Sequence, residues 1–376
     1  MRVLVAPDKF AGTLTAVEAA DAMSDGWLRR RPGDDVVAAP MSDGGPGFID
    51  ALHAVLGGDV HAITVAGPLG RPTPATLLLA LVAGRRTGFV ESAQACGVAL
   101  LPRDASGRNP EPDVVEAAST WGVGEIVAAA VDAGAGEIVV GLGGSGTNDG
   151  GAGMLGALGA VAEPVDALSG GAAGLPSLRS VDLHPARDRL GGCRLTAASD
   201  VTSPLLGLRG ATNVYGPQKG LSRERLFVVD GALSTYAHLV DRDAADAPGA
   251  GAAGGLGYAL TVLGAEHRPG IELVAQASGL ATQLATADLV LTGEGTLDPQ
   301  TFTGKVVAGV AGMAGAAGVA CVALAGRLEV GSRELRAAGV DGAYSMVDTI
   351  GVEPSMMRPA ESLAQLAERV ARTWGR

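Results

Sequence analysis

The sequence contains few residues of the kinds that build disulfides or zinc sites. Its three cysteines, Cys96, Cys193 and Cys321, lie far apart in apolar surroundings and form no CxxC pair. We therefore expect neither disulfides nor a cysteine-based metal site. The five histidines show no HxxxH or HExxH spacing, which argues against a zinc hydrolase.

Basic residues are also scarce. The chain of 376 residues has 28 Lys and Arg against 40 Asp and Glu, a formal net charge of −12. Proteins that bind nucleic acid or anionic membranes need a basic surface, so both kinds of partner are disfavoured. A small cleft on an acidic protein can still be locally positive, so the composition is compatible with an anionic small molecule.

Lysine is the rarest charged residue, and only Lys9, Lys219 and Lys305 occur. A coding bias toward arginine would explain the scarcity. Each of the three nevertheless lies in a glycine-rich or proline-containing loop. Because arginine cannot replace lysine where a compact, mobile point charge is needed, we interpret the three as functional.

The chain lacks the long apolar run of an exported or membrane-spanning protein. Its first residues, MRVLVAP, contain too short an apolar stretch for a signal peptide. The uncharged segment 306–326 is rich in alanine and glycine. We interpret it as a helix that ends near Gly318, followed by a buried strand. We therefore expect a cytoplasmic protein.

Hydrophobic residues make up 47% of the chain, enough for a sizeable core, and the length suits two domains or one large one. Short apolar runs at 2–6, 35–39 and 137–142 alternate with helical patterns, which predicts an α/β fold with a mainly parallel sheet. Segment 61–97 has short strand patterns and turns but little helix. It predicts antiparallel strands in an inserted or second domain.

Carboxylates recur directly after the predicted strands. In open parallel sheets, ligands bind beyond the carboxyl ends of the strands. An Asp at such a position can also cap the following helix, so both roles remain open. The acids at these positions are Asp8, Asp43, Asp149, Asp200, Glu294 and Asp298.

The glycine-rich segment 141–151, GLGGSGTNDGG, is the strongest local motif. Between a strand and a helix, such a loop presents backbone N–H groups that cradle phosphate. Asp149 within it is a candidate ligand of a divalent cation. Residues 141–146 also match the dinucleotide pattern GxGxxG, but no acid ends a second strand about 20 residues later. The P-loop pattern is absent.

Two further segments pair acids with lysine. Glu294 and Asp298 precede Lys305, and Asp200 precedes Lys219. No GxSxG elbow occurs. Acids, lysines and a phosphate-cradling loop together indicate phosphoryl transfer, which requires charge neutralisation, a metal and a proton acceptor.

These motifs resemble the bacterial glycerate kinases of the type I family over nearly the whole chain. In chain order they are APDKFAGTL at 6–14, PMSDGGPGF at 40–48, GLGGSGTNDGGAGML at 141–155, ASDVTSPLLG at 198–207, GPQKG at 216–220 and GEGTLDPQTFTGK at 293–305. The resemblance implies ATP-dependent phosphorylation of D-glycerate with Mg²⁺, usually to 2-phosphoglycerate. It also implies two α/β domains. We expect a flavodoxin-like parallel sheet from residues 1–62 and 286–376, and an inserted mixed-sheet domain at 63–285.

Within this scheme, each candidate residue receives a role. The catalytic candidates are Asp200, Asp298, Lys219 and Lys305. The candidates for the ATP phosphates are Gly143, Gly144, Ser145, Thr147 and Asn148. The candidates for the glycerate side are Asp8, Lys9, Asp43 and Arg71. The metal candidates are Asp149 and Glu294, and the order of metal and base roles among the acids stays open.

The sequence departs from the family pattern at three positions. A lysine of the family is Ala11 here, and Pro46 and Phe48 replace a glutamate and a threonine. If these positions touch the substrate, the chain would be a substrate-shifted or non-catalytic hydroxy-acid-binding relative. A dinucleotide-binding oxidoreductase is the remaining alternative. We expect a small-molecule substrate, a homodimer as one possible assembly, and no nucleic-acid or membrane partner.

Overall fold

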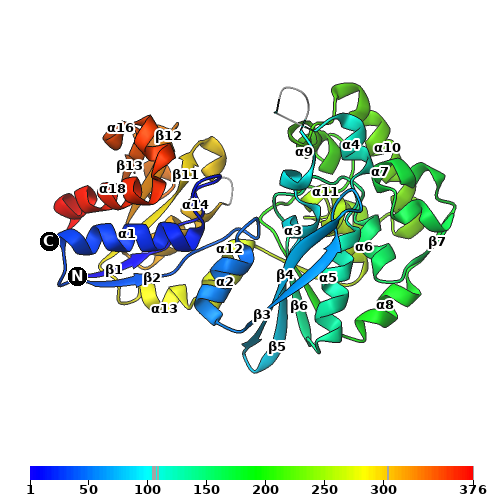
Figure 1. The fold of residues 1–376 in the computed structure, drawn as a ribbon, viewed down its shortest axis with the longest axis horizontal. Coiled ribbons are helices and arrows are strands. Elements are labelled where there is room, and N and C mark those ends of the chain that lie inside the picture. The colour runs from blue at the N-terminus through cyan, green and yellow to red at the C-terminus, as the bar shows by residue number, and fades with distance from the viewer. Residues whose placement is uncertain (104–106, 108–109, 303–304, 376) are drawn as a thin grey trace. The chain divides into compact units, whose positions relative to one another are not determined.

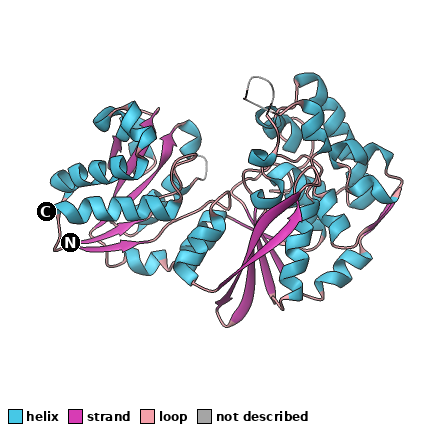
Figure 2. Cartoon of the chain, viewed as in Figure 1, coloured by secondary structure: helices cyan, strands magenta, loops and turns pink. Residues whose placement is uncertain are grey.

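The computed structural model describes residues 1–103, 107, 110–302 and 305–375. The chain divides into two compact units, each with its own sheet (Figures 1 and 2). Unit 1 comprises Met1–Asp43, Asp50–Gly57 and Gly270–Arg376. Unit 2 comprises Gly44–Ile49 and Gly58–Pro269. Unit 1 is thus assembled from both ends of the chain.

Unit 1 contains a five-stranded, fully parallel sheet. Its strands are β1 (Arg2–Val5), β2 (Asp35–Ala38), β11 (Leu289–Leu297), β12 (Ala320–Leu328) and β13 (Gly342–Ser345). They lie in the order β13-β12-β11-β1-β2. Counted along the chain, this is the order 2-1-3-4-5 of flavodoxin-like sheets.

Helices cover the sheet of unit 1. α1 (Ala16–Arg30) and α18 (Pro359–Trp374) pack side by side on one face and bury Trp27 (Figure 1). A capping box starts α1: Thr15 Oγ1 accepts from Glu18 N, and Glu18 accepts from Thr15 N. The other helices are α12 (Gly270–Ala277), α13 (Leu280–Leu284), α14 (Val306–Ala316), α15 (Ser332–Ala337), α16 (Met346–Ile350) and α17 (Val352–Met357).

Unit 2 contains a mixed sheet of six strands in the order β10-β9-β6-β5-β4-β3. The segment predicted to be antiparallel forms β3 (Asp59–Ala66), β4 (Pro72–Val82) and β5 (Arg85–Glu91), which pair antiparallel. β5, β6 (Glu137–Gly141), β9 (Arg194–Ala198) and β10 (Glu266–Arg268) run parallel. A parallel sheet and a mixed sheet confirm the predicted fold class. β7 (Val161–Glu163) and β8 (Ser180–Asp182) form a separate pair.

The helices of unit 2 surround one large core. Tyr236 and Tyr258 meet edge to face inside it, with ring centroids 5.7 Å apart. α2 (Phe48–Leu56) contributes Phe48 and Ile49 to unit 2 and its remainder to unit 1. The other helices are α3 (Ala93–Cys96), α4 (Pro112–Ala117), α5 (Trp121–Asp132), α6 (Ala152–Ala157), α7 (Gly171–Gly174), α8 (His184–Leu190), α9 (Ala211–Lys219), α10 (Arg223–Val240) and α11 (Ala252–Val262).

Two apolar segments bear on membrane insertion. Segment 306–326 forms α14, a turn with Gly318 in the left-handed conformation, and β12, as predicted. Within the described residues, one other stretch, Pro112–Asp132, is long and apolar enough to cross a membrane, and it is 61% buried. Buried core helices pass the same test, so this stretch is weak support for a membrane span.

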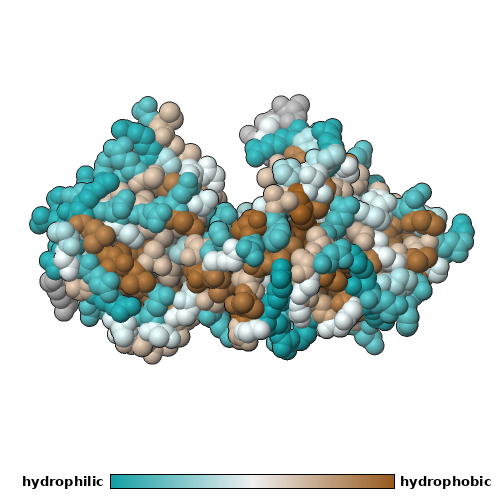
Figure 3. Space-filling model, turned by 60° about the horizontal axis from the view of Figure 1, so that its bottom comes forward, coloured by the Kyte–Doolittle hydropathy of each residue, from teal (hydrophilic) through white to brown (hydrophobic). Residues whose placement is uncertain are grey.

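Apolar side chains also reach the surface. Figure 3 shows them as separate patches among hydrophilic ones. The most exposed large members include Leu208 and Phe227 in unit 2 and Met357 in unit 1. Soluble and membrane proteins alike expose single apolar residues, so these positions by themselves define no site.

Candidate functional site

A cavity of about 440 Å³ lies in unit 1, and we call it the acid pocket. It forms at the carboxyl ends of β1 and β11, the neighbouring strands from which the chain leaves in opposite directions. This topological switch point is where sheets of this kind bind ligands. The charged residues that line the acid pocket are Asp8, Lys9, Asp43, Glu294, Asp298, Lys305 and Arg327, and Thr13, Thr296 and Ser355 add neutral polar groups.

Asp8 forms one side of the acid pocket. It follows β1, and its backbone N–H donates to the carbonyl of Gly293 on β11 at 2.8 Å. The residue is only 6% exposed, and burial raises the pKa of its carboxyl group to about 6. Lys9 opposes this rise in the pKa of Asp8, because its Nζ lies 3.6 Å from Asp8 Oδ1. The same Nζ lies 3.9 Å from Asp43 Oδ1, and the charge of Asp43 adds to the rise. The sequence-predicted trio of Asp8, Lys9 and Asp43 therefore comes together.

Glu294 forms the opposite side. The sequence pattern predicts Glu294 after the strand, but the residue lies within β11, whose pairing with β12 continues to Leu297. Thr301 Oγ1 donates to Glu294 Oε1 at 2.5 Å. Burial raises the pKa of Glu294 to about 7, against the lowering effects of Thr301 and Lys305. Asp298 Oδ1 accepts from Thr301 N at 3.1 Å, so one threonine orients both acids.

One part of the wall of the acid pocket is apolar. Met346 and Val347 of α16, and Val352 and Met356 of α17, line it beside the charged groups. Sequence reasoning missed these four residues, because segment 346–357 carries no recognisable motif. An apolar wall beside carboxylates and lysines can hold a ligand that has both an apolar ring and a charged chain.

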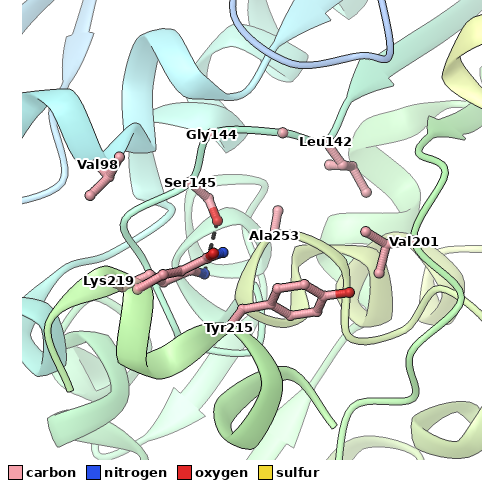
Figure 4. Close-up of a pocket in the computed structure, with 10 residues that line it drawn as sticks. Val98, Leu142, Gly144, Ser145, Val201, Tyr215, Lys219 and Ala253 are labelled. Atoms are coloured by element: carbon pink, nitrogen blue, oxygen red, sulfur yellow. Dashed lines mark hydrogen bonds between the residues drawn. The ribbon is translucent and has the colours of Figure 1, made fainter. Parts of the chain in front are cut away.

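A second cavity, of about 300 Å³, lies in unit 2, and we call it the Lys219 pocket. Lys219 and Ser145 point toward one another inside it (Figure 4). Lys219 Nζ donates to Ser145 Oγ at 3.0 Å and to the carbonyl of Thr147 at 2.7 Å. Gly143 and Gly144 line the same cavity. The structure thus joins the predicted glycine loop to a predicted lysine 74 residues away.

Backbone pairing fixes the loop that carries Ser145. The loop bridges to Gly97, Val98 N donates to the carbonyl of Gly144 at 2.9 Å, and Gly146 N donates to the carbonyl of Cys96 at 2.8 Å. Gly144 has φ +68°, and a Cβ there would meet the Pro46 ring at 2.8 Å. Glycine is therefore required for both the conformation and the close approach.

Two of the residues predicted to bind ATP phosphates do not line the Lys219 pocket. Thr147 and Asn148 are fully buried. The Thr147 carbonyl accepts from Lys219, and Asn148 Nδ2 donates to Thr212 Oγ1 at 2.8 Å. Both residues hold the loop in shape, so their predicted contact with phosphate is not supported.

The predicted metal ligand Asp149 is also a structural residue. Its buried carboxylate accepts from Thr120 N at 2.9 Å and from Thr120 Oγ1 at 2.8 Å. It also accepts from Gly151 N and Gly153 N at the start of α6. Four donors occupy the two oxygens, and burial raises the pKa of the group. These hydrogen bonds favour a structural role for Asp149 at the start of α6, and its role as a metal ligand stays a prediction.

Asp200 and Arg71 line neither cavity. Asp200 follows β9, but the cavity wall is formed by the next residue, Val201. Arg71 lies exposed between β3 and β4, where its carbonyl accepts from Gly67 N and Thr73 Oγ1. Neither residue thus contributes to the wall of the two cavities, and their predicted roles stay predictions.

Sequence reasoning also missed Tyr215, Gln218 and Ala253 in the Lys219 pocket. Gln218 lies in the GPQKG motif, and Ala253 lies in a GAAGG segment. Their position in these motifs could have identified both as candidate site residues. Ala253 has φ +51°, an uncommon conformation for a residue other than glycine. Backbone strain of this kind occurs preferentially at ligand sites.

The geometry of the glycine loop does not fit the dinucleotide alternative. In that motif the helix opens at the third glycine, and the pyrophosphate sits at its N-terminus. Here α6 begins at Ala152, well after Gly146, and has only six residues. The loop is packed instead against the left-handed backbone of Gly254 and Gly255.

The departures from the family pattern can also be located. Phe48 is buried against Phe89, with ring centroids 6.3 Å apart, and lines neither cavity. Pro46 is exposed, and its ring approaches Gly144. Ala11 lines the acid pocket together with Lys9. A lysine charge is therefore present in the cavity where the family lysine is missing.

A flavodoxin-like sheet with carboxylates and lysines at its switch point defines an α/β enzyme of the phosphotransferase type. The chain matches the glycerate kinase family over residues 3–375 and belongs to that family.

Individual relatives agree with this assignment. The chain is 38% identical to a glycerate kinase of Bacillus subtilis (strain 168), over 99% of this chain and 97% of the relative. It is 36% identical to a glycerate 2-kinase of Escherichia coli (strain K12), over 99% and 98%. The crystal structure of a protein named putative glycerate kinase 2, from Salmonella typhimurium LT2, superposes with a TM-score of 0.81 at 38% identity, covering 99% of this chain and 98% of that chain. The prediction of an enzyme of this kind is confirmed.

Proposed function

We propose that the chain catalyses ATP-dependent phosphorylation of D-glycerate at its 2-hydroxyl group, giving 2-phosphoglycerate. The observation that carries the proposal is the acid pocket, where carboxylates, lysines and an apolar wall meet at a switch point. Family membership supports glycerate as the acceptor. The name of the E. coli relative, glycerate 2-kinase, supports the 2-hydroxyl.

The acid pocket suits the nucleotide. The apolar side chains of α16 and α17 offer a surface for a purine ring, and Lys9 and Lys305 offer charges for its phosphates. This assignment reverses the roles that the sequence predicted for the glycine loop and for Asp8, Lys9 and Asp43. The reason is that, of the two cavities, the acid pocket is the one that combines cations with carboxylates able to hold a metal.

The carboxylates of the acid pocket fit Mg²⁺. Glu294 and Asp298 supply hard oxygen ligands, which Mg²⁺ prefers. In the described part of the chain, no group of three acidic, histidine or cysteine side chains is poised around one point. Mg²⁺ is usually held by one or two carboxylates together with nucleotide phosphates, and Glu294 and Asp298 supply two. Bound there, it would neutralise charge on the transferring phosphoryl group.

The remaining steps belong to the side chains. The hydroxyl of the acceptor must lose a proton as it attacks, and a pocket carboxylate accepts it. Lys305, at the start of α14, stabilises negative charge that develops on the transferring group.

The test is ADP release from Mg²⁺-ATP in the presence of D-glycerate, with the product resolved by ³¹P NMR. We expect turnover that yields 2-phosphoglycerate and stops when EDTA removes the metal. Glycerol serves as the control acceptor that lacks the carboxylate. Formation of 3-phosphoglycerate would contradict the assigned position, and metal-independent turnover would contradict the role of Glu294 and Asp298.

The second candidate is a hydroxy-acid-binding relative without catalysis. Its motivation was the loss of family residues at Ala11, Pro46 and Phe48. Pro46 and Phe48 lie outside both cavities, and Lys9 supplies charge near Ala11, which favours the kinase. Thermal stabilisation by D-glycerate without any ADP release would favour the second candidate instead. A cytoplasmic location and a homodimer remain predictions.

A further inference from the structure

Lys219 is a buried cation without an ion-pair partner in the described part of the chain. The residue is 4% exposed, and its two hydrogen-bond acceptors, Ser145 Oγ and the Thr147 carbonyl, are both neutral. A buried charge is costly unless an opposite charge compensates it. The ion pairs among the described residues include none for Lys219.

The nearest acid does not neutralise this charge directly. Asp149 attracts Lys219, but its oxygens already accept from Thr120, Gly151 and Gly153. The other neighbouring titratable group, Cys96, has its pKa raised to about 12 by burial and is therefore a neutral thiol. Within the part of the chain that the structure describes, no carboxylate neutralises Lys219 directly, which favours an external anion as its counter-ion.

The surroundings of Lys219 match a small anion. The cavity of about 300 Å³ is at the lower end of the ~300–1,000 Å³ range of ligand pockets. Tyr215 and Gln218 add neutral polar groups to its wall, and the strained Ala253 lies on the same wall (Figure 4). No Asp or Glu lines it, in contrast to the acid pocket.

We propose that the Lys219 pocket binds the carboxylate of the hydroxy-acid substrate, with Lys219 as its counter-ion. Ser145 holds the ammonium group in place, and Tyr215 and Gln218 are available to the hydroxyl groups of the acid. A single cation with neutral neighbours suits a monocarboxylate better than a nucleotide triphosphate, which also needs a metal. The proposal rests on the proposed function for the identity of the acid.

Binding to the full-length protein tests the proposal without catalysis. Isothermal titration calorimetry is performed without Mg²⁺, with D-glycerate, ADP and inorganic phosphate as separate probes. The substitution Lys219→Met keeps the length of the side chain and removes its charge. We expect it to weaken D-glycerate binding by roughly 30-fold or more, the effect of removing one partner of a buried charge pair, and to leave ADP binding unchanged.

Lys305→Met is the matched control in unit 1. It should leave D-glycerate binding within about twofold of the wild type and weaken ADP instead. If Lys219→Met loses ADP or phosphate affinity and keeps D-glycerate affinity, the pocket holds a phosphate and the proposal is overturned. Unchanged affinity for every probe would overturn it as well.

A second measurement on the wild type does not depend on the folding of a variant. D-glyceramide, in which a neutral amide replaces the carboxylate, should bind at least about 30-fold more weakly than D-glycerate. Equal affinities would overturn the proposal.

Failure of the proposed function can be distinguished from failure of this inference. If the Lys219→Met protein turns over D-glycerate with an unchanged KM, the proposed kinase function stands and this inference is contradicted. Lys219-dependent binding of D-glycerate without ADP release would support this inference and contradict the proposed kinase activity.

Discussion

Thr301 Oγ1 donates a hydrogen bond of 2.5 Å to Glu294 Oε1, and Thr301 N donates to Asp298 Oδ1. One residue between β11 and α14 thus orients both carboxylates proposed to hold Mg²⁺. Partners behind a metal ligand usually affect activity by about 10–100-fold, because they fix the direction of the ligand. The relationship gives Thr301 a positioning role.

The substitution Thr301→Val removes the hydroxyl and nearly preserves the volume. We expect kcat to fall by about 10–100-fold and the Mg²⁺ concentration for half-maximal activity to rise. Steady-state kinetics over a Mg²⁺ titration measures both. Thr301→Ser, which keeps the hydroxyl, should stay near the wild type. An unchanged Mg²⁺ requirement in Thr301→Val would rule out the positioning role.

Removing a pocket carboxylate should affect catalysis more strongly than folding. Asp298→Asn keeps the size of the side chain and removes its charge. We expect kcat to fall by about 10²–10⁴-fold, the range for loss of a base or an electrostatic stabiliser. Asp50→Asn, on the exposed side of α2, is the matched control and should keep full activity. An active or unfolded Asp298→Asn protein would contradict the assignment.

Asp149 should behave in the opposite way. Its carboxylate accepts four hydrogen bonds, and an amide in Asp149→Asn would turn one NH₂ group toward those donors. We expect the free energy of unfolding to fall by about 1–3 kcal/mol, the usual cost of unsatisfied buried groups. The Mg²⁺ requirement should not change.

Denaturant unfolding measures the stability of Asp149→Asn. Asp132→Asn provides the comparison, because it disrupts only an exposed ion pair with Arg189, worth about 0–1 kcal/mol. A folded Asp149→Asn protein with wild-type stability and an altered Mg²⁺ requirement would support the metal role predicted from the sequence.

The contrast between Asp8 and Asp149 marks how far the sequence could predict the site. Both are acids in glycine-containing loops that follow strands, and motif and position do not separate them. The two acids differ in their tertiary contacts. Asp149 accepts a hydrogen bond from Thr120, 29 residues earlier in the chain, whereas Asp8 forms an ion pair with Lys9 at a cavity. Local pattern gives the position relative to the strand, but hydrogen-bond partners distant in sequence decide the role.

The fold was more predictable than the site, because its signals are local. The capping box of Thr15 and Glu18 and the short alternating strands of segment 61–97 each act over a few residues. The apolar wall of the acid pocket had no such signal. Met356 and Val352 are part of a short helix whose composition is ordinary, and only packing brings them beside the carboxylates.

The pH dependence of glycerate binding follows from Lys219. Burial lowers the pKa of Lys219 to about 8, while the charge of Asp149 opposes the shift. Lysine is a cation below its pKa and neutral above it, so it can act as a counter-ion only below about pH 8. We expect kcat/KM for D-glycerate, which reports the free enzyme, to decline as the pH rises through about 8, with KM for ATP unaffected.

The substitution Lys219→Arg distinguishes the titration of Lys219 from the titration of other groups. Because arginine does not lose its proton in this pH range, Lys219→Arg should abolish the decline, whatever its absolute activity. For wild-type protein, calorimetric affinity for D-glycerate should fall above about pH 8, while affinity for neutral D-glyceramide should stay constant. A decline that persists in Lys219→Arg would assign the titration to a different group and leave the charge of Lys219 without a role in binding.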